Sequence, residues 1–497
     1  MAILEVVSRK GIKIEWIDKV IGAGTMKDVY FSPDKKYVVG FYREKLDATA
    51  KDRLNSIVGV YRDKIIKGLN GDYWEKLLCW PYDIVEYNGL TGVVVPVYQN
   101  HFFFKHGSVN NDMLGIKGKE KNGKWFASAK NQNRFLHNDE KGDLLSYLRI
   151  SILLSRATKR LHAAGLAHSD LSYNNVLIDP EGKNASIIDI DGLVVPGKFA
   201  PDVMGTPDFV APEVIMTKHL PVKDSNRKLP SILTDRHALA VLIYMYLLFR
   251  HPLKGGKIHH TDTQKDVELA MGSKALFIEN IQDKSNLPNL NDIHPAELPY
   301  IDVHKMPCTI LGPHLEGLFK KAFIDGLHNP QRRPTADEWE AGLVKTVDLL
   351  QPCNNTKCSH KWFVFNNKLS PKCPYCQTPY VAELPILNFY STRSAGKYLS
   401  DDARLMVYNN QYLYKWHSNR LIKPNERLSE KDKKPVGYFT KHQGKWILVN
   451  QNLPELFDVI NKKQIPIGKH VVLEDNVQLL LEKGNGGRLA IIQMVNK

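Results

Sequence analysis

The order of apolar and polar positions predicts a strand-rich start to this chain. Three apolar runs, at residues 13–21, 29–31 and 37–42, have the length and the β-branched or aromatic content of short strands. A turn-forming pair, Pro33 and Asp34, separates the last two runs, which therefore predict a hairpin.

Helical spacing follows further along. Apolar residues recur every three or four positions at 54–65, which predicts an amphipathic helix, and 144–161 repeats this pattern over a longer stretch. Two more strand-like runs lie between these helices, at 84–87 and 93–97. Residues 238–249 are apolar on all sides but too few to span a bilayer, so we expect a buried helix there.

The last part of the chain returns to strand-like patterns. From residue 385 on, short alternating runs are separated by turns rich in Gly, Asn and Lys. This pattern predicts an antiparallel β-sandwich of about 110 residues. It distantly resembles a forkhead-associated domain, a phosphothreonine reader, but the Ser-x-x-His that this family combines with Asn-Gly is missing, so we expect a scaffold or docking role. The predicted strands include 404–407, 446–449, 470–473, 478–481 and 488–494.

The composition is that of an ordinary globular protein. The 497 residues are 43% hydrophobic and 24% charged, which suits two or three domains with well-developed cores. No targeting segment and no bilayer-length apolar run is evident, so we expect a cytoplasmic protein without a membrane partner. The net charge of +15 is spread along the chain, which favours acidic or phosphorylated partners over nucleic acid. The lysine-rich stretch 101–141 is expected to be a solvated loop anchored by its aromatic residues, with a partner-docking insertion as the alternative.

Four of the six cysteines are spaced as metal ligands. Cys353 and Cys358 are followed, after 14 intervening residues, by Cys373 and Cys376. Two pairs of thiolates on adjacent turns can close a tetrahedral zinc site, and a site closed by four protein ligands is structural. The spacing predicts a zinc ribbon, with His360 as an alternative for one ligand.

The stretch 168–191 carries the most specific chemistry. Phosphoryl transfer needs mainly positioning and charge neutralisation, and Asp170, Asn175 and Asp189 stand in an order that supplies both. Asp170 would orient the attacking hydroxyl, while Asn175 and Asp189 would give Mg²⁺ hard oxygen ligands on ATP. Asp191 either adds a second carboxylate or caps a turn. In the alternative interpretation, these residues only form turns in a strand–turn–strand segment.

These motifs resemble those of the eukaryotic-like protein kinases over about residues 10–347. The resemblance implies a bilobal α+β kinase fold, followed in this chain by the ribbon and the sandwich. The expected domains are a kinase domain at 1–350 (N-lobe 1–97, C-lobe 98–350), a zinc ribbon at 351–382 and a β-sandwich-like docking domain at 383–497.

The resemblance also suggests how ATP would be held. The segment GAGTMKDVY resembles the phosphate-covering loop, with Gly22 and Gly24 allowing close approach of backbone amides, and Val97 lies where the family contacts adenine. Gly40 stands where the family places its ATP lysine, but the with-no-lysine kinases carry it on the second strand, at the place of Lys27. Cross-strand neighbours are only about 5 Å apart, so we expect Lys27, roughly opposite Gly40, to bind the phosphates. In the alternative it is a solvated edge residue. The family's helix glutamate that pairs with this lysine is not identifiable, and Asp52 and Asp63 remain unassigned candidates.

Other matches and departures concern the substrate side. GTPDFVAPE resembles the peptide-substrate segment, Asp235 would hold the catalytic-loop backbone, and Arg333 would pair with Glu213. Ser169 replaces the arginine that usually binds an activating phosphate, and residues 192–205 contain no Ser, Thr or Tyr. We therefore expect activity that does not wait for phosphorylation within that segment.

The order of kinase, four-cysteine ribbon and β-domain resembles the bacterial kinases of the tellurium-resistance-associated phosphorylation triad. This resemblance implies a stress-response module with a PP2C-type phosphatase and a von Willebrand factor A-type protein. We expect an ATP- and Mg²⁺-dependent protein kinase acting on serine or threonine rather than tyrosine. A pseudokinase scaffold is the alternative, disfavoured by the complete catalytic set. A small-molecule kinase of the choline or aminoglycoside type is disfavoured by the peptide-substrate segment.

Overall fold

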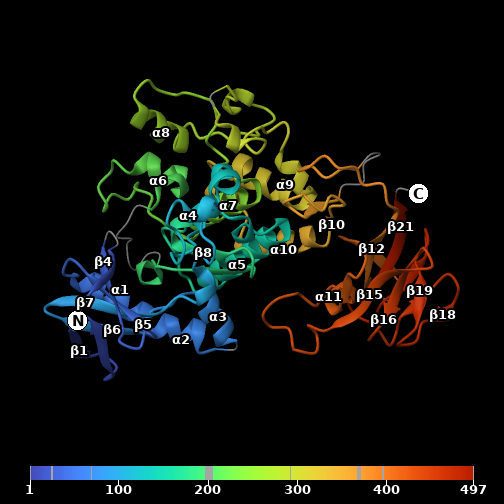
Figure 1. The fold of residues 1–497 in the computed structure, drawn as a ribbon, viewed down its shortest axis with the longest axis horizontal. Coiled ribbons are helices and arrows are strands. Elements are labelled where there is room, and N and C mark those ends of the chain that lie inside the picture. The colour runs from blue at the N-terminus through green and yellow to red at the C-terminus, as the bar shows by residue number, and fades with distance from the viewer. Residues whose placement is uncertain are drawn as a thin grey trace. The chain divides into compact units, whose positions relative to one another are not determined.

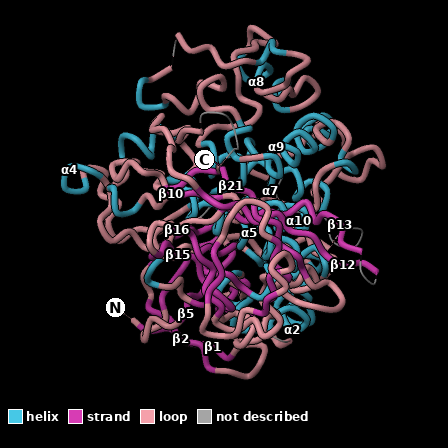
Figure 2. Tube along the Cα trace, turned by 90° about the vertical axis from the view of Figure 1, so that its right-hand side faces the viewer, coloured by secondary structure: helices cyan, strands magenta, loops and turns pink. Residues whose placement is uncertain are grey.

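The computed structural model describes residues 2–23, 26–68, 70–195, 205–291, 293–365, 371–394 and 397–495. The chain divides into two compact units. The first comprises Met1–Cys308 and Gly317–Glu340, and the second comprises Thr309–Glu316 and Ala341–Lys497. Figure 1 follows the chain from its blue N-terminus to its red C-terminus, and Figure 2 separates helices from strands by colour.

A five-stranded antiparallel sheet forms the N-terminal part of the first unit, in the order β3-β4-β5-β7-β6. The predicted hairpin is present, because β4 pairs with β5. The sheet brings the phosphate-loop strands next to the strand that ends near Val97. Its strands are β3 (Val20–Ala23), β4 (Lys27–Phe31), β5 (Tyr37–Tyr42), β6 (Asp83–Tyr87) and β7 (Leu90–Pro96).

The single strand expected over 13–21 is in fact two strands. β2 (Lys13–Ile17) pairs with β1 (Ile3–Val7), and the chain turns before it enters β3. The β1–β2 hairpin buries Ile14 and Trp16 in a hydrophobic cluster with side chains of the five-stranded sheet. The apolar pattern continues across the turn, so the sequence alone shows one strand where the structure has two.

The predicted amphipathic helix packs on the sheet. α1 (Ala48–Ser56), a short π-helical turn (Ile57–Tyr61) and α2 (Arg62–Ile66) follow one another without a break. Leu54 and Val58 pack with apolar side chains of β5, β6 and β7 in a second hydrophobic cluster. The helix is thereby fixed against the strands that would hold ATP.

The helical part of the first unit is built around two long helices. α5 (Leu144–Ala163) packs against α7 (Ile232–Leu248), which is buried along nearly all of its length. β8 (Val176–Asp179) and β9 (Asn184–Ile187) form an antiparallel pair beside α5. Among the described residues, no helix has both the length and the apolar content needed to cross a bilayer. Shorter α-helices of the first unit are α3 (Gly71–Leu77), α4 (Val109–Asp112), α6 (Pro212–Thr217) and α8 (Thr263–Met271), while α9 (Pro313–Lys320) and α10 (Ala336–Val347) contain residues of both units.

The lysine-rich segment 101–141 is anchored by its aromatic residues, as expected, and Lys105, Lys117, Lys119 and Lys124 are exposed. Its aromatic side chains are largely buried, with Phe104 only 2% exposed. Lys121 is buried as well, because its ammonium lies 3.0 Å from Glu140 and 2.9 Å from Asp179, two buried carboxylates. A hydropathy pattern treats Lys121, Glu140 and Asp179 each as an exposed charged residue. It therefore cannot predict that the three are buried together because their charges neutralise one another.

The second unit contains a two-stranded antiparallel sheet, β10-β11, and two larger antiparallel sheets, ordered β13-β12-β21-β20-β17-β18 and β14-β15-β16-β19. Apolar side chains of both larger sheets, among them Phe389, Phe439 and Ile492, form one hydrophobic cluster. Each of the five predicted strands lies on an observed one, while β12, β14, β15, β17 and β18 were not predicted. The elements are β10 (Leu350–Pro352), β11 (Trp362–Val364), β12 (Leu384–Ser394), β13 (Lys397–Met406), β14 (Tyr412–Tyr414), α11 (Lys415–Ser418), β15 (Pro435–His442), β16 (Lys445–Asn450), β17 (Phe457–Asp458), β18 (Lys463–Gln464), β19 (His470–Val472), β20 (Gln478–Leu480) and β21 (Arg488–Val495).

Candidate active site

The loop that carries Asp170 connects α5 to β8 and is fastened to α7. The backbone N–H groups of His168 and Ser169 donate to the two carboxylate oxygens of Asp235, at 2.7 and 3.2 Å. Ser169 has a φ of +66°, a left-handed conformation that is costly for a non-glycine residue and persists where surrounding contacts hold it. Asp235 is 2% exposed, so these bonds lie away from water. The expected role of Asp235 is confirmed.

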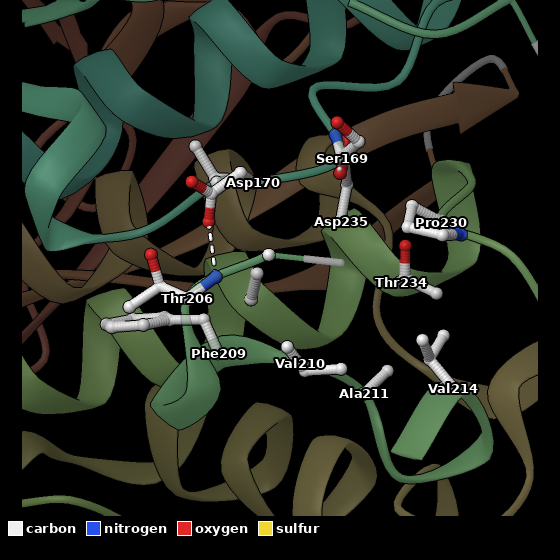
Figure 3. A pocket seen from close by; sticks show the side chains of 13 residues that line it. Ser169, Asp170, Thr206, Phe209, Val210, Ala211, Val214, Pro230, Thr234 and Asp235 are labelled. Atoms are coloured by element: carbon white, nitrogen blue, oxygen red, sulfur yellow. Dashed lines mark hydrogen bonds between the residues drawn. The ribbon is translucent and has the colours of Figure 1, made fainter. Parts of the chain in front are cut away.

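Asp170 is held from two sides. Its Oδ1 atom accepts the backbone N–H of Thr206 at 2.6 Å, as Figure 3 shows, and its Oδ2 atom accepts the side-chain N–H of Asn175 at 2.8 Å. The same Asn175 nitrogen also donates to the Asp170 carbonyl at 2.8 Å. Because the amide nitrogen of Asn175 is directed at Asp170, its amide oxygen points away and is the atom suited to a cation.

Asn175 and Asp189 lie at the open end of the β8–β9 hairpin, one directly before β8 and the other just after β9. The backbone N–H of Ile188 donates to the Asn175 carbonyl at 3.0 Å, which places the next residue, Asp189, near the catalytic loop. Asp189 has a left-handed φ of +58° and a side chain that is 49% exposed. Its Oδ1 atom is 3.0 Å from Lys27 Nζ. An amide oxygen and an exposed carboxylate are hard donors of the kind that Mg²⁺ takes, so these residues fit that cation.

Lys27 has a second and closer acidic partner. Its Nζ atom is 2.6 Å from Oδ2 of Asp191, whose side chain is 5% exposed, and the Tyr42 hydroxyl donates to the same oxygen. Burial disfavours the lysine cation, but the Asp191 and Asp189 carboxylates outweigh burial and raise the pKa of Lys27 above its ordinary value. Burial also opposes the Asp191 anion, yet Lys27 and Tyr42 hold the pKa of Asp191 below its ordinary range. The pair is therefore charged at neutral pH.

The strand register differs from the expectation that Lys27 lies opposite Gly40. β4 pairs with β5 so that Lys27 faces Tyr42, and Val29 faces Gly40. The turn over residues 32–36 sets this register. The lysine stem nevertheless extends diagonally toward Gly40, since a Cβ atom added there would lie 3.6 Å from Lys27 Cδ. Because Gly40 has no side chain, space is left next to the Lys27 side chain.

The other residues expected to bind ATP lie around the same strands. Gly22 pairs with Val29 at a register shift between β3 and β4. Gly24 lies outside the described residues. The backbone N–H of Val97 donates to the Lys36 carbonyl at 3.3 Å, so an adenine contact at Val97 would use its carbonyl oxygen.

A pocket opens beside Asp170 on the substrate side (Figure 3). The catalytic loop, the segment that follows Gly205 and the start of α7 line it, with mostly apolar side chains from that segment. The Arg333 guanidinium binds the Glu213 carboxylate through two bonds of 2.8 and 2.7 Å, which confirms the expected ion pair. This pair anchors the end of the pocket-lining segment. Residues 196–204, most of the stretch without hydroxyl side chains, lie outside the described residues.

The four cysteines expected to bind zinc gather in the second unit. The sulfur atoms of Cys353 and Cys376 are 3.5 Å apart, those of Cys358 and Cys373 are 4.0 Å apart, and all four lie within 4.8 Å of one another. Zinc–sulfur bonds of about 2.3 Å in a tetrahedron place sulfurs about 3.8 Å apart, so the group fits zinc. His360 is not part of this group, because its ring stacks on a neighbouring tyrosine at 3.7 Å between centroids.

Sequence reasoning left the acidic partner of Lys27 unassigned. The sequence of α1, ATAKDRLNS, contains no glutamate, and its buried charged side chain is Arg53, which is 5% exposed. Burial lowers the pKa of Arg53, while the Asp191 carboxylate favours its charged form. The second aspartate of the motif Asp189-Ile190-Asp191 was a visible candidate for the partner of Lys27. The sequence alone could not show that Asp191 contacts β4.

Fold and site together define a class of protein. A strand-rich lobe, a helical lobe whose catalytic loop is fastened to α7, and the group Asp170, Asn175 and Asp189 are the features of a protein kinase fold.

Comparisons with known proteins agree with this class. Residues 132–341 match the family model of the protein kinase domain. "Death-associated protein kinase related" of Drosophila melanogaster is 32% identical over 131 residues, which are 25% of this chain and 17% of that protein. "Death-associated protein kinase dapk-1" of Caenorhabditis elegans is 34% identical over 103 residues, which are 20% of this chain and 6% of that protein. "Atypical protein kinase C" of Drosophila melanogaster is 27% identical over 183 residues, which are 36% and 26% of the two chains.

The matched regions are thus small parts of these relatives, and the chain spans no more than 26% of the length of any of the three. Among solved structures, the kinase domain of a Toxoplasma gondii rhoptry antigen aligns with a TM-score of 0.39 and 13% identity, over 70% of this chain and 86% of that one. That likeness is too distant to support fold or function.

Proposed function

We propose that this protein is an ATP- and Mg²⁺-dependent protein kinase that phosphorylates serine or threonine hydroxyls. The observation that carries the proposal is the fixed position of Asp170, whose carboxylate oxygens are held by Thr206 and Asn175 beside an open pocket. A carboxylate held in this way can accept a hydrogen bond from a substrate hydroxyl and orient it for attack on the γ-phosphate. The match of residues 132–341 to the protein kinase domain supports the same reaction.

The strand-rich lobe would hold the nucleotide. We assign the phosphates to Lys27 and to the backbone of the loop that contains Gly22 and Gly24. The carbonyl oxygen of Val97 would accept the adenine amino group, because its N–H is already bonded. Lys27 lies 3.0 Å from Asp189, so its charge stands next to the expected metal ligand.

Asn175 and Asp189 would hold Mg²⁺, which when bound neutralises phosphate charge and lowers the barrier to transfer. Asn175 has a second role, because its amide nitrogen donates a hydrogen bond that holds the Asp170 carboxylate in position. One side chain thus links the hydroxyl-orienting carboxylate to the metal side of the site.

The test compares the purified chain with two variants in an assay with γ-labelled ATP and Mg²⁺. Asp170→Asn removes the carboxylate that orients the hydroxyl, so we expect transfer to fall at least about 100-fold while ATP binding survives. Asp189→Asn should instead weaken Mg²⁺-dependent ATP binding, measured by titration with a fluorescent ATP analogue. Near-normal transfer by Asp170→Asn contradicts the assignment. Nucleotide binding without transfer by the wild-type chain indicates a pseudokinase scaffold.

We further propose that the remainder of the chain recruits partners to a kinase domain at 1–350. The four-cysteine group supports a structural zinc ribbon at 351–382, and the two antiparallel sheets around one cluster support a β-sandwich-like docking domain at 383–497. Following the resemblance to the tellurium-resistance-associated kinases, the partners would be a PP2C-type phosphatase and a von Willebrand factor A-type protein in a bacterial cytoplasmic stress response. Binding of these purified partners to the full chain, compared with a chain lacking 383–497, tests this role.

A further inference from the structure

The environment of Lys27 lacks the anion that a helix would normally supply. The one aspartate of α1, Asp52, is exposed, and the buried charged residue of this helix is the cation Arg53. The partly buried cation Lys27 therefore needs an anion from another part of the fold. The carboxylate of Asp191 attracts both Lys27 and Arg53.

The contacts of Asp191 fix its carboxylate in one place. Lys27 approaches Oδ2 at 2.6 Å, and the Tyr42 hydroxyl donates to the same atom. Lys27 and Tyr42 are direct cross-strand partners on β4 and β5, so side chains from two neighbouring strands bind the same Asp191 oxygen. The side chain of Asp191 is 5% exposed, whereas that of Asp189 is 49% exposed. The buried carboxylate is placed to hold the lysine, and the exposed one is left for a cation.

We propose that Asp191 is a positioning residue, which takes the place of the missing helix glutamate and holds Lys27 toward the ATP phosphates. This inference rests on the proposed function, because it assigns Lys27 to the phosphates. Two other roles for Asp191 make different predictions. A second metal ligand would act only when Mg²⁺ is present, and a turn cap would affect folding without regard to Lys27.

A double-mutant cycle of Asp191→Asn and Lys27→Met separates these roles. The probe is a fluorescent ADP analogue titrated without Mg²⁺, so a metal ligand cannot contribute. We expect Asp191→Asn to weaken ADP binding about fivefold in the chain with Lys27, because an unanchored lysine must be ordered on binding. In the Lys27→Met background it should have no further effect. Equal effects in both backgrounds, or no effect in either, would overturn the proposal.

A matched control is available on α2, away from the loop over the phosphates. Asp63 is exposed and binds Lys67 at 2.9 Å, so Asp63→Asn should leave ADP binding unchanged. Transfer at saturating ATP should fall at least about tenfold in Asp191→Asn. If the wild-type chain transfers no phosphate, the proposed function fails, while the ADP cycle still decides the role of Asp191. Should Asp191→Asn not fold, Asp191→Glu, which displaces the same charge by one methylene, must show the same dependence on Lys27.

Discussion

Lys27 extends toward a position where Gly40 has no side chain, and this geometry gives its role a direct test. Lys27→Met should leave folding intact and lower transfer at least about 100-fold, because a charge on the transferring phosphates is lost. Lys27→Gly combined with Gly40→Lys should recover part of the rate, since a side chain from position 40 starts 3.6 Å from the present Lys27 Cδ. The measurement is the initial rate at saturating ATP.

The control for this pair is Lys35→Met, a change at an exposed turn residue that should be silent. A Lys27→Met variant as active as this control would reject the role of Lys27 and strengthen the pseudokinase interpretation. If Lys27→Met loses activity and the double variant does not recover it, Lys27 is essential. That result would reject the idea that a lysine at position 40 can replace it.

Single residues also show what the sequence could and could not predict. Asp170 and Asn175 lie five residues apart on one loop, and their side chains are in hydrogen-bond contact at 2.8 Å, as the spacing predicts. The anchoring of the loop by Asp235 followed from the order of motifs. The partner of Lys27 could not be predicted, because Asp191 is 164 residues away and its choice depends on which face of β4 meets the β8–β9 hairpin.

At the scale of elements, the four cysteines predict one tightly bound Zn²⁺ per chain. Replacing Cys353 and Cys358 by Ser should abolish zinc binding and unfold the ribbon, because metal binding supplies the folding free energy of so small a module. The kinase domain should keep its fold. Metal analysis of chelator-free protein and thermal unfolding of both proteins provide the measurement.

Cys308→Ala is the control for this change, since Cys308 is buried in the first unit and outside the four-cysteine group. It should retain one zinc per chain. Protein purified without chelator that contains no zinc would reject the ribbon.

Elements also differ in how well the local sequence pattern predicts their limits and their burial. α5 and β5 were predicted with nearly their observed limits, because each has one clear apolar period and a distinct turn or glycine beside it. Within the segment 101–141, the burial of Lys121 was not predicted, because it depends on Glu140 and Asp179, which become neighbours only in the folded chain.

The molecule as a whole should lose stability as the pH falls. Burial and nearby cations, Arg333 first among them, lower the pKa of His237 well below its ordinary value, and burial together with Lys254 lowers that of His251 to about 4. Histidines in the unfolded chain titrate near about 6.5. Below that pH the unfolded state binds more protons than the folded state, so the free energy of unfolding decreases on acidification. We expect the urea midpoint to fall between about pH 6.5 and 4.

The variant that tests this cause is His237→Leu. Neither ring nitrogen of His237 has a hydrogen-bond partner among the described residues, so the change sacrifices no such bond and should flatten the acid dependence. His304→Gln, at an exposed position, should leave the dependence unchanged. A midpoint that rises on acidification would contradict the account.

The ion pair between Arg333 and Glu213 has a consequence for how this fold can change over evolution. It joins two positions 120 residues apart and so closes the intervening chain into a ring. The entropic cost of closing a flexible ring grows only with the logarithm of its length, by about 0.6 kcal/mol for each doubling. Loops within this ring can therefore gain or lose residues at small thermodynamic cost, while the pocket wall anchored by Glu213 keeps its place.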